Sequence, residues 1–236
     1  MLRKYIYAVV IIVSCVTLNS CQKTADDHYN NSMDFVKAKD FNSAIIELDK
    51  AIEINPKYAK AYLDRGRYRF NLQFFNAVVN SNIDDSVKLG SLFESSVKDF
   101  NKVIELDLAL VKDALIGRGH AYMALKKYNK ASSDFEEVLK KDSSNKQITG
   151  ITVHCKLLLK DTVGAKLLMD RIIGISPNDA ENYYGRAIHR LISFNNKIGA
   201  CEDLKKAEEL YNQNEKYLEK DLIGKIKELQ KINCNK

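Results

Sequence analysis

The chain has 236 residues and a formal net charge of +6, with 29% charged residues, two prolines and no tryptophan. This small positive excess is spread along the chain without a dense basic stripe, which argues against nucleic acid as a partner. Alternation of apolar and polar residues is not sustained anywhere, so composition and pattern together predict an all-α protein.

The first twenty residues differ from the rest of the chain. Arg3 and Lys4 precede a nearly unbroken apolar run from Tyr5 to Leu18, whose 14 residues are too few to span a bilayer core of about 30 Å. Such a run is typical of the apolar core of a secretory signal. We therefore predict a signal peptide over residues 1–20.

The signal ends in Leu18-Asn19-Ser20-Cys21, which resembles the processing site of bacterial lipoproteins. The resemblance implies cleavage before Cys21, acylation of that cysteine, and a tether over residues 21–25 that holds the chain at a membrane. The implied location is the bacterial cell envelope. Gln22 after the cysteine favours the outer membrane, on its periplasmic side or at the cell surface. An ordinary cleaved signal and an uncleaved short anchor are the alternatives.

From residue 26 onward, one spacing recurs five times. In each set the second and third residues follow the first by 4 and 7 positions, which places all three on one face of a helix. We expect each face to be buried. The five stripes are Ala44, Leu48 and Ala51; Ser96, Phe100 and Val103; Ala131, Phe135 and Val138; Ala165, Met169 and Ile172; and Ala200, Leu204 and Ala207.

A partner helix is expected upstream of each stripe, where a small residue marks the close approach of two backbones. These residues are Ser32, Gly66, Gly119 and Ala187, with the larger Val153 in the fourth unit. Successive stripes begin 52, 35, 34 and 35 residues apart, which is close to the length of one helical hairpin except for the first step.

In the third unit, Arg118-Gly119, Tyr122, Ala131 and Phe135 form a pattern that resembles the tetratricopeptide repeat. The resemblance implies a right-handed α-solenoid of about five helix-turn-helix repeats over residues 26–214, followed by a capping helix over residues 215–236. The fourth unit departs from the pattern in its first helix, at Thr149, Val153 and Lys156.

The second unit contains an insertion at about residues 71–91. Gly66 precedes the stripe residue Ser96 by 30 positions, 18 more than in the first and third units, which predicts two helices lengthened by about two and a half turns each. The turn is expected at residues 80–86. The apolar residues of the insertion either close this hairpin or contact a partner: Phe74, Phe75, Val78, Val79, Leu92 and Phe93.

The first helices of such repeats line a concave groove, and the resemblance implies that a protein or peptide partner binds there. The chain would then act as a non-enzymatic scaffold, because no nucleophile–base arrangement and no cofactor motif occurs in the sequence. The groove residues expected by analogy are Tyr29, Met33, Lys37, Arg67, Phe70, Asn71, His120, Met123, His154, Tyr184 and His189.

An alternative role is binding of peptidoglycan or another glycan in the envelope. Four tyrosines would then offer stacking faces to sugar rings, namely Tyr29, Tyr62, Tyr183 and Tyr184.

The cysteines and histidines do not have the spacing of metal ligands, so we expect no metal site. His120, His154 and His189 lie on successive repeats and would form a ladder, about 10 Å between rungs, rather than a cluster. Beyond Cys15 and Cys21, three cysteines remain: Cys155, Cys201 and Cys234. A disulfide between Cys201 and Cys234 is one hypothesis, and three small apolar fillers are the other.

Overall fold

A computed structural model describes residues 23–79, 86–214 and 220–234. Within these residues the chain forms eleven α-helices and one short 3-10 helix, and no strand. The chain divides into two compact units, each larger than one repeat. The first unit ends at Gly117 and the second begins at Arg118, so the boundary falls inside one helix.

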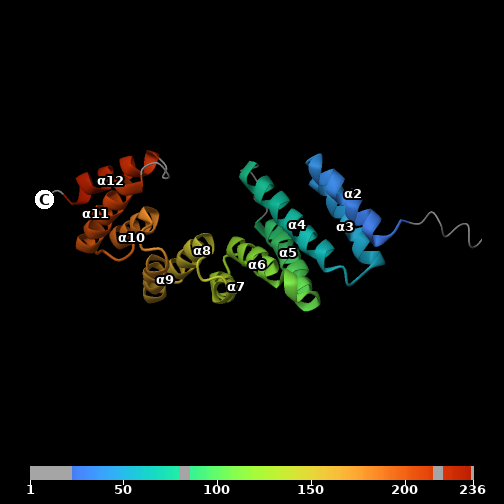
Figure 1. Cartoon of the computed structure of the whole chain (residues 1–236). Coiled ribbons are helices and arrows are strands. Elements are labelled where there is room, and N and C mark those ends of the chain that lie inside the picture. Colours follow the sequence, from blue (N-terminus) through green and yellow to red (C-terminus); the bar gives the residue numbers. More distant parts are fainter. Residues whose placement is uncertain (1–22, 80–85, 215–219, 235–236) are drawn as a thin grey trace, which may run out of the picture. The chain divides into compact units, whose positions relative to one another are not determined.

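The helices follow one another as hairpins (Figure 1). In chain order the elements are α2 (Ala25–Lys37), α3 (Phe41–Ile54), α4 (Ala59–Val79), α5 (Ser86–Leu106), the 3-10 helix η2 (Leu108–Leu110), α6 (Val111–Ala124), α7 (Tyr128–Lys141), α8 (Lys146–Leu158), α9 (Thr162–Ile175), α10 (Ala180–Ile192), α11 (Lys197–Asn214) and α12 (Lys220–Asn233). The first unit contains the hairpins α2/α3 and α4/α5. The second contains α8/α9, α10/α11 and the helix α12, which packs on α11.

All fifteen stripe residues are buried, each with 9% or less of its surface exposed. They lie on α3, α5, α7, α9 and α11, the second helices of the hairpins. The prediction of an all-α fold built from repeated helical hairpins is therefore confirmed, including a helical first segment in the fourth repeat, which is α8.

The small residues on the first helices allow a stripe aromatic to approach the backbone. A Cβ atom added at Gly119 would lie 2.6 Å from the ring of Phe135, and one added at Gly117 would lie 2.5 Å from the ring of Phe100. Both rings are fully buried. Glycine is therefore required at these positions by packing.

The turns inside the hairpins repeat as well. Lys39, Lys126 and Lys160 have backbone φ angles of 61°, 57° and 60°, in the left-handed region, and each precedes the residue before a second helix. Asp40 and Asp161 then cap α3 and α9 by accepting hydrogen bonds from backbone N–H groups in the first turn.

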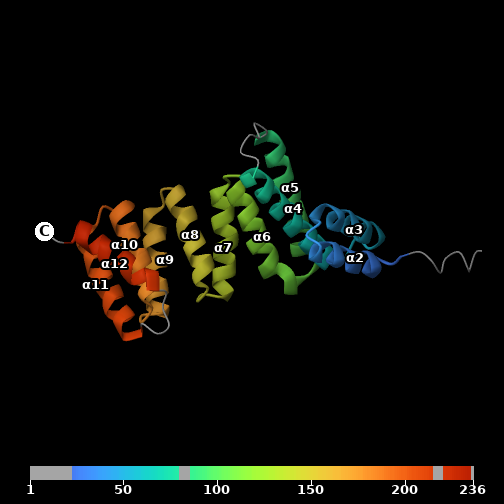
Figure 2. The same cartoon turned by 90° about the horizontal axis from the view of Figure 1, so that it is seen from above.

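The α4/α5 hairpin is longer than its neighbours, since each helix has 21 residues where α2 and α3 have 13 and 14 (Figure 2). This is the lengthening that the insertion requires. Phe93 is buried and its ring lies 5.6 Å from that of Phe70. The side chains of the other apolar insertion residues, Phe74, Phe75, Val78, Val79 and Leu92, lie outside the described part of the structure.

A disulfide joins Cys201 on α11 to Cys234 just beyond α12. Leu222 and Ile226 of α12 pack into a cluster with Leu204 and Tyr211 of α11. Of the two hypotheses for these cysteines, the structure has the bridged one. Cys155 is a buried thiol, and burial raises its pKa.

Among the described helices, none has the length and apolar character needed to cross a membrane. The apolar run of residues 5–18, Cys21 and the first part of the tether lie outside the described residues.

Candidate partner-binding surface

Arginine side chains join the two helices of several hairpins. Arg186 on α10 donates hydrogen bonds to both carboxylate oxygens of Asp203 on α11, at 2.9 Å from Nε and 2.7 Å from Nη2. Its remaining Nη1 donates to Asp170 on α9 at 2.7 Å, so one guanidinium connects two successive hairpins. The hydrogen bond to Asp203 raises the pKa of Arg186, although burial opposes this.

The same arrangement occurs elsewhere, and we call it the Arg–Asp bridge. Arg118 on α6 binds Asp134 on α7 at 2.8 and 2.7 Å. Arg65 on α4 binds Asp99 on α5 and, through Nη1, Asp49 on α3. Because both oxygens of each buried aspartate are engaged, these charges stabilise the hairpins and are not available to a ligand.

The Arg–Asp bridges were not recognised from the sequence, although a signal exists. The aspartates Asp99, Asp134 and Asp203 each lie three residues after the first stripe residue, on the buried side of the helix. Lys156 makes a comparable link between hairpins, since it pairs with Glu136 on α7 at 2.7 Å.

In the first unit, the expected groove residues take part mainly in packing between helices. Tyr29 is buried, and its hydroxyl donates to Asp64 on α4 at 2.7 Å; burial, reinforced by this bond, raises its pKa. Met33 accepts a weak contact from Tyr68, and Arg67 pairs with both Asp64 and Asp113.

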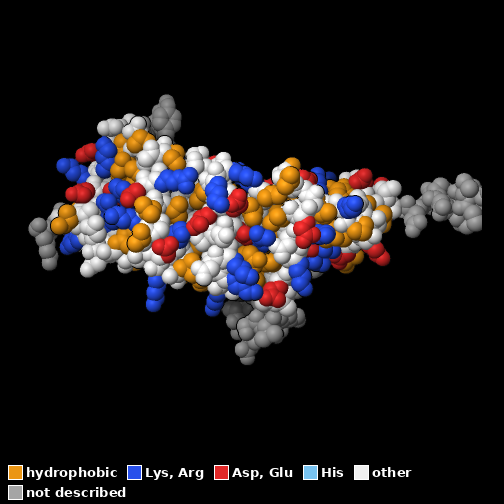
Figure 3. Space-filling model, turned by 90° about the horizontal axis from the view of Figure 1, so that it is seen from below, with side chains coloured by type: hydrophobic (Ala, Val, Ile, Leu, Met, Phe, Trp, Pro, Cys, Tyr) orange, Lys and Arg blue, Asp and Glu red, His pale blue; other side chains and the backbone are white. Residues whose placement is uncertain are grey.

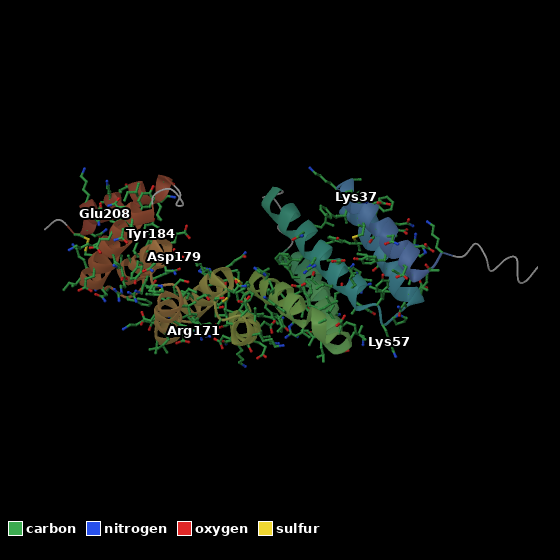
Figure 4. The ribbon with its side chains drawn as sticks, viewed as in Figure 1. Lys37, Lys57, Arg171, Asp179, Tyr184 and Glu208 are labelled. Carbon is green, nitrogen blue, oxygen red and sulfur yellow. A yellow bond between two sulfur atoms is a disulfide. The ribbon has the colours of Figure 1, made fainter. Side chains whose placement is uncertain are left out.

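The remaining residues of the first unit's set are more accessible. Lys37 is exposed at the end of α2, where it pairs with Asp34 (Figure 4). Asn71 is exposed, and Phe70 is half-buried against Phe93. Only part of the expected set therefore offers a free surface.

In the second unit, the expected residues lie on α6, α8 and α10. The His120 ring lies edge-on to Phe135, with 5.4 Å between centroids, and Met123 is half-buried. His154 is exposed. Burial, together with the charge of His154, lowers the pKa of His189.

A pocket lies between α8 and α10, with α9 behind it, and has a volume of about 140 Å³. His189 is the one expected groove residue that lines it. Tyr184 is half-buried on α10 and packs against the α10/α11 core (Figure 4). The sequence did not indicate this pocket.

The tyrosine faces needed for sugar stacking are largely covered. The guanidinium of Arg65 lies 5.2 Å from the centre of the Tyr62 ring, and that of Arg186 lies 5.7 Å from the Tyr183 ring. Tyr29 is buried. Glycan binding through these rings is therefore not favoured.

The described residues give no charge pattern typical of nucleic-acid binding and no arrangement typical of a metal site. On the face shown in Figure 3, Lys and Arg side chains are interspersed with Asp and Glu. Within the described ranges, no group of three His, Cys, Asp or Glu residues is placed to hold a metal ion.

Comparisons with known proteins agree with this architecture. Residues 112–145, which form α6, α7 and the turn after them, match the model of the tetratricopeptide repeat family. No curated protein matches the sequence of the chain.

Solved tetratricopeptide-repeat structures share the fold. The chain is similar to MamA residues 41 to the end from Desulfovibrio magneticus RS-1, with 14% identity, a TM-score of 0.62, and coverage of 82% of this chain and 98% of that one. It is similar to YrrB, described as a TPR protein with an unusual peptide-binding site, with 15% identity, a TM-score of 0.59, and coverage of 83% and 91%. It is also similar to the C-terminal part of a TPR repeat-containing protein from Cytophaga hutchinsonii, with 10% identity, a TM-score of 0.63, and coverage of 90% and 77%.

Proposed function

We propose that the chain is a non-enzymatic scaffold of the bacterial cell envelope, held at a membrane by lipid on Cys21, that binds a protein or peptide partner on its first helices. The observation that carries the binding role is that buried carboxylates are engaged within the chain, while a pocket stays open on the first helices. The buried aspartates are engaged in Arg–Asp bridges, whereas the pocket between α8 and α10, which Arg186 also lines, opens between two first helices.

Two further observations support a binding role. Repeated hairpins leave one face of each first helix unpacked by its own hairpin, which suits an extended peptide or a partner helix. YrrB, which has the same fold, is described by its peptide-binding site. The tetratricopeptide repeat is a scaffold on which binding is set by surface residues, so the partner follows from those residues and not from the fold.

Crosslinking in the native cell tests the binding role. The tagged full chain is treated with formaldehyde, purified under denaturing conditions, and the attached proteins are identified by mass spectrometry. We expect a small set of envelope proteins that decreases at least tenfold with the double variant Lys37→Ala and His154→Ala, which changes two exposed side chains on the first helices α2 and α8.

The matched control for this experiment is Lys140→Ala with Lys166→Ala, which removes two cations from the second helices α7 and α9. It should leave the attached set unchanged. Equal loss with both double variants, or no specific partner with the wild-type chain, would contradict the proposal.

The lipid anchor is tested separately, by growing cells with an alkyne analogue of palmitate. The wild-type chain should incorporate the label and fractionate with membranes, because acyl chains contribute about 0.8 kcal/mol per buried CH₂. Cys21→Ser should lose both properties, whereas Cys155→Ser should keep them. A wild-type chain without label would reject lipidation and leave partner binding undecided.

A further inference from the structure

The pocket between α8 and α10 has an apolar floor and a polar mouth. Val153 on α8 and Met169 and Ile172 on α9 form the floor. All three are buried, and they belong to the stripe and small-residue positions of the fourth hairpin. Lys146, Glu181 and Asn182 lie at the mouth, at the N-terminal ends of α8 and α10. Thr149, Arg186 and His189 also line the pocket.

Two glycines of the first helices lie at the pocket. Gly150 on α8 and Gly185 on α10 both line it, and a Cβ atom added at either would meet no other atom within 4 Å. Glycine inside a helix lowers stability. Gly119 has a packing reason, because the ring of Phe135 occupies the space of its missing side chain. At Gly150 and Gly185 that space is empty.

The volume of about 140 Å³ limits what the pocket can hold. Pockets for drug-sized ligands and cofactors measure about 300–1,000 Å³. An apolar cavity of about 150 Å³ accepts a molecule as small as benzene. The pocket therefore suits one medium-sized apolar group, and its polar mouth suits the peptide groups on either side of a side chain.

The charged residues that line the pocket are Lys146 on α8 and Glu181 and Arg186 on α10. Lys146 on α8 pairs with Asp179, but its side chain is still 51% exposed, and exposed His154 lies further along the same helix. Asp179 precedes α10, as Figure 4 shows, and exposed Glu181 lies in the first turn of that helix. An acidic group of a ligand is therefore favoured at Lys146, whose side chain is half exposed.

Building on the proposed binding role, we infer that the pocket between α8 and α10 receives a single aliphatic side chain, such as leucine, isoleucine or methionine, from a linear segment of a partner protein. An acidic residue next to it lies toward Lys146. The pocket is the position at which this chain selects its ligand, and the two glycines determine the size of the side chain that fits.

The probe for the test is a random library of twelve-residue peptides displayed on phage, selected on the full chain in mild detergent. Peptides enriched on the wild-type chain are synthesised, and their binding is measured by fluorescence polarisation. We expect them to share one aliphatic position with an acidic neighbour. Alanine at the aliphatic position should weaken binding at least tenfold.

The variants Gly150→Leu and Gly185→Leu fill the pocket from either side without a steric clash at Cβ. Each should weaken binding at least tenfold while the melting curve stays cooperative. On Gly150→Leu, the alanine peptide and its parent should bind equally. Gly224→Leu on α12 is the matched control, since its Cβ would also meet no atom within 4 Å, and it should bind like the wild type.

Peptides that lack a shared aliphatic position, or that bind Gly150→Leu as tightly as the wild type, would overturn this inference while leaving the scaffold role intact. Failure to enrich any peptide would also overturn it. The crosslinking experiment decides the scaffold role independently, because it does not require a linear ligand.

Discussion

The α6/α7 and α8/α9 hairpins have the same spacing but are joined differently. Arg118 on α6 binds Asp134 on α7, whereas the positions 34 residues later hold Thr152 and Leu168. Thr152 is fully buried, and its hydroxyl donates to the carbonyl of Ile148 on its own helix. Leu168 packs against an apolar cluster of the same hairpin. A charged link has thus been replaced by an apolar contact.

This difference shows that burial of the stripe is common to both hairpins, and that the charged link is dispensable. The first helix packs on the buried stripe at Gly119 in one hairpin and at the larger Val153 in the other. The family model matches residues 112–145, which include the bridged hairpin, and not the one that follows. The α8/α9 hairpin, which lacks the Arg–Asp bridge, contributes Gly150 and the floor of the pocket.

The largest effect is expected from the stripes. Phe135→Ala should lower the free energy of unfolding by about 3–5 kcal/mol, and the equivalent Met169→Ala by about 2–5 kcal/mol, because both side chains are buried. Urea unfolding followed by circular dichroism measures both. Leu167→Ala, at a side chain that is 64% exposed, is the control and should change stability by less than about 0.5 kcal/mol. Equal effects at positions 135 and 167 would show that the register of the repeats is wrong.

The charged link is tested by converting one hairpin into the other. Arg118→Thr leaves Asp134 buried without its arginine and should cost about 3 kcal/mol. The double variant Arg118→Thr with Asp134→Leu copies the α8/α9 solution and should recover most of that loss. A double variant no more stable than the single one would mean that the hairpin depends on the Arg–Asp bridge and that an apolar contact cannot replace it.

The disulfide should matter only at the C-terminal end. Reduction, or Cys201→Ala with Cys234→Ala, should lower the stability of the second unit by about 2–4 kcal/mol, because the bond closes a loop between residues separated by 33 positions. Hydrogen exchange should increase first in α12. Protection in α2 and α3 should stay unchanged, and a uniform increase along the chain would argue against a local role.

Replacing a glycine on a first helix by alanine should lower stability at one position and raise it at another. Gly119→Ala forces a methyl group to within 2.6 Å of the Phe135 ring and should cost about 1–3 kcal/mol. Gly150→Ala enters open space and should stabilise the chain by up to about 1 kcal/mol. Thermal melting compares the two, and the same sign at both positions would be inconsistent with the packing described.

The first hairpin has a third kind of link, which predicts a small dependence on pH. Burial alone would raise the pKa of Glu47, but hydrogen bonds from Lys50, His28 and Asn31 lower it to about 2. Because this pKa is lower in the folded state than the ordinary value of 4.5 for a glutamate, the stabilising contribution of Glu47 is present above pH 4.5 and is lost as the pH falls towards 2.

Glu47→Gln should therefore reduce the loss of stability between pH 4.5 and pH 2, by about 1 kcal/mol. Glu53→Gln on the same helix is the control, since Glu53 is exposed. It should not change the loss of stability between pH 4.5 and pH 2. Parallel curves of stability against pH for Glu47→Gln and the wild type would show that the Glu47 carboxylate makes no such contribution.

The repeats could be predicted from the sequence because burial of a helix face follows from spacing alone. The 4 and 7 offsets identify every stripe, and Gly119 marks where Phe135 must approach. Partner-facing residues were harder to predict, since exposure depends on which side chain of another helix covers a position. Tyr29 is on the expected helix, but it is buried because it packs with Leu48 and Ala61 of the next two helices, and its hydroxyl donates to Asp64, 35 residues away.

Features that need two helices at once were missed or left open. The pocket arises because Gly150 and Gly185 line the same space, which no spacing within one helix indicates. The Arg–Asp bridges pair residues 16 or more positions apart, and the Cys201–Cys234 pairing required knowledge that α12 packs on α11.

Site-specific photo-crosslinking in living cells tests most directly whether the first helices bind the partner. A photoreactive amino acid is placed at His154 on α8 or, as the matched control, at Leu167 on α9, both of which are exposed. We predict a discrete crosslinked product from position 154 that disappears with Gly150→Leu, and none from position 167. Equal products from both positions, or a product from position 167 alone, would contradict the account.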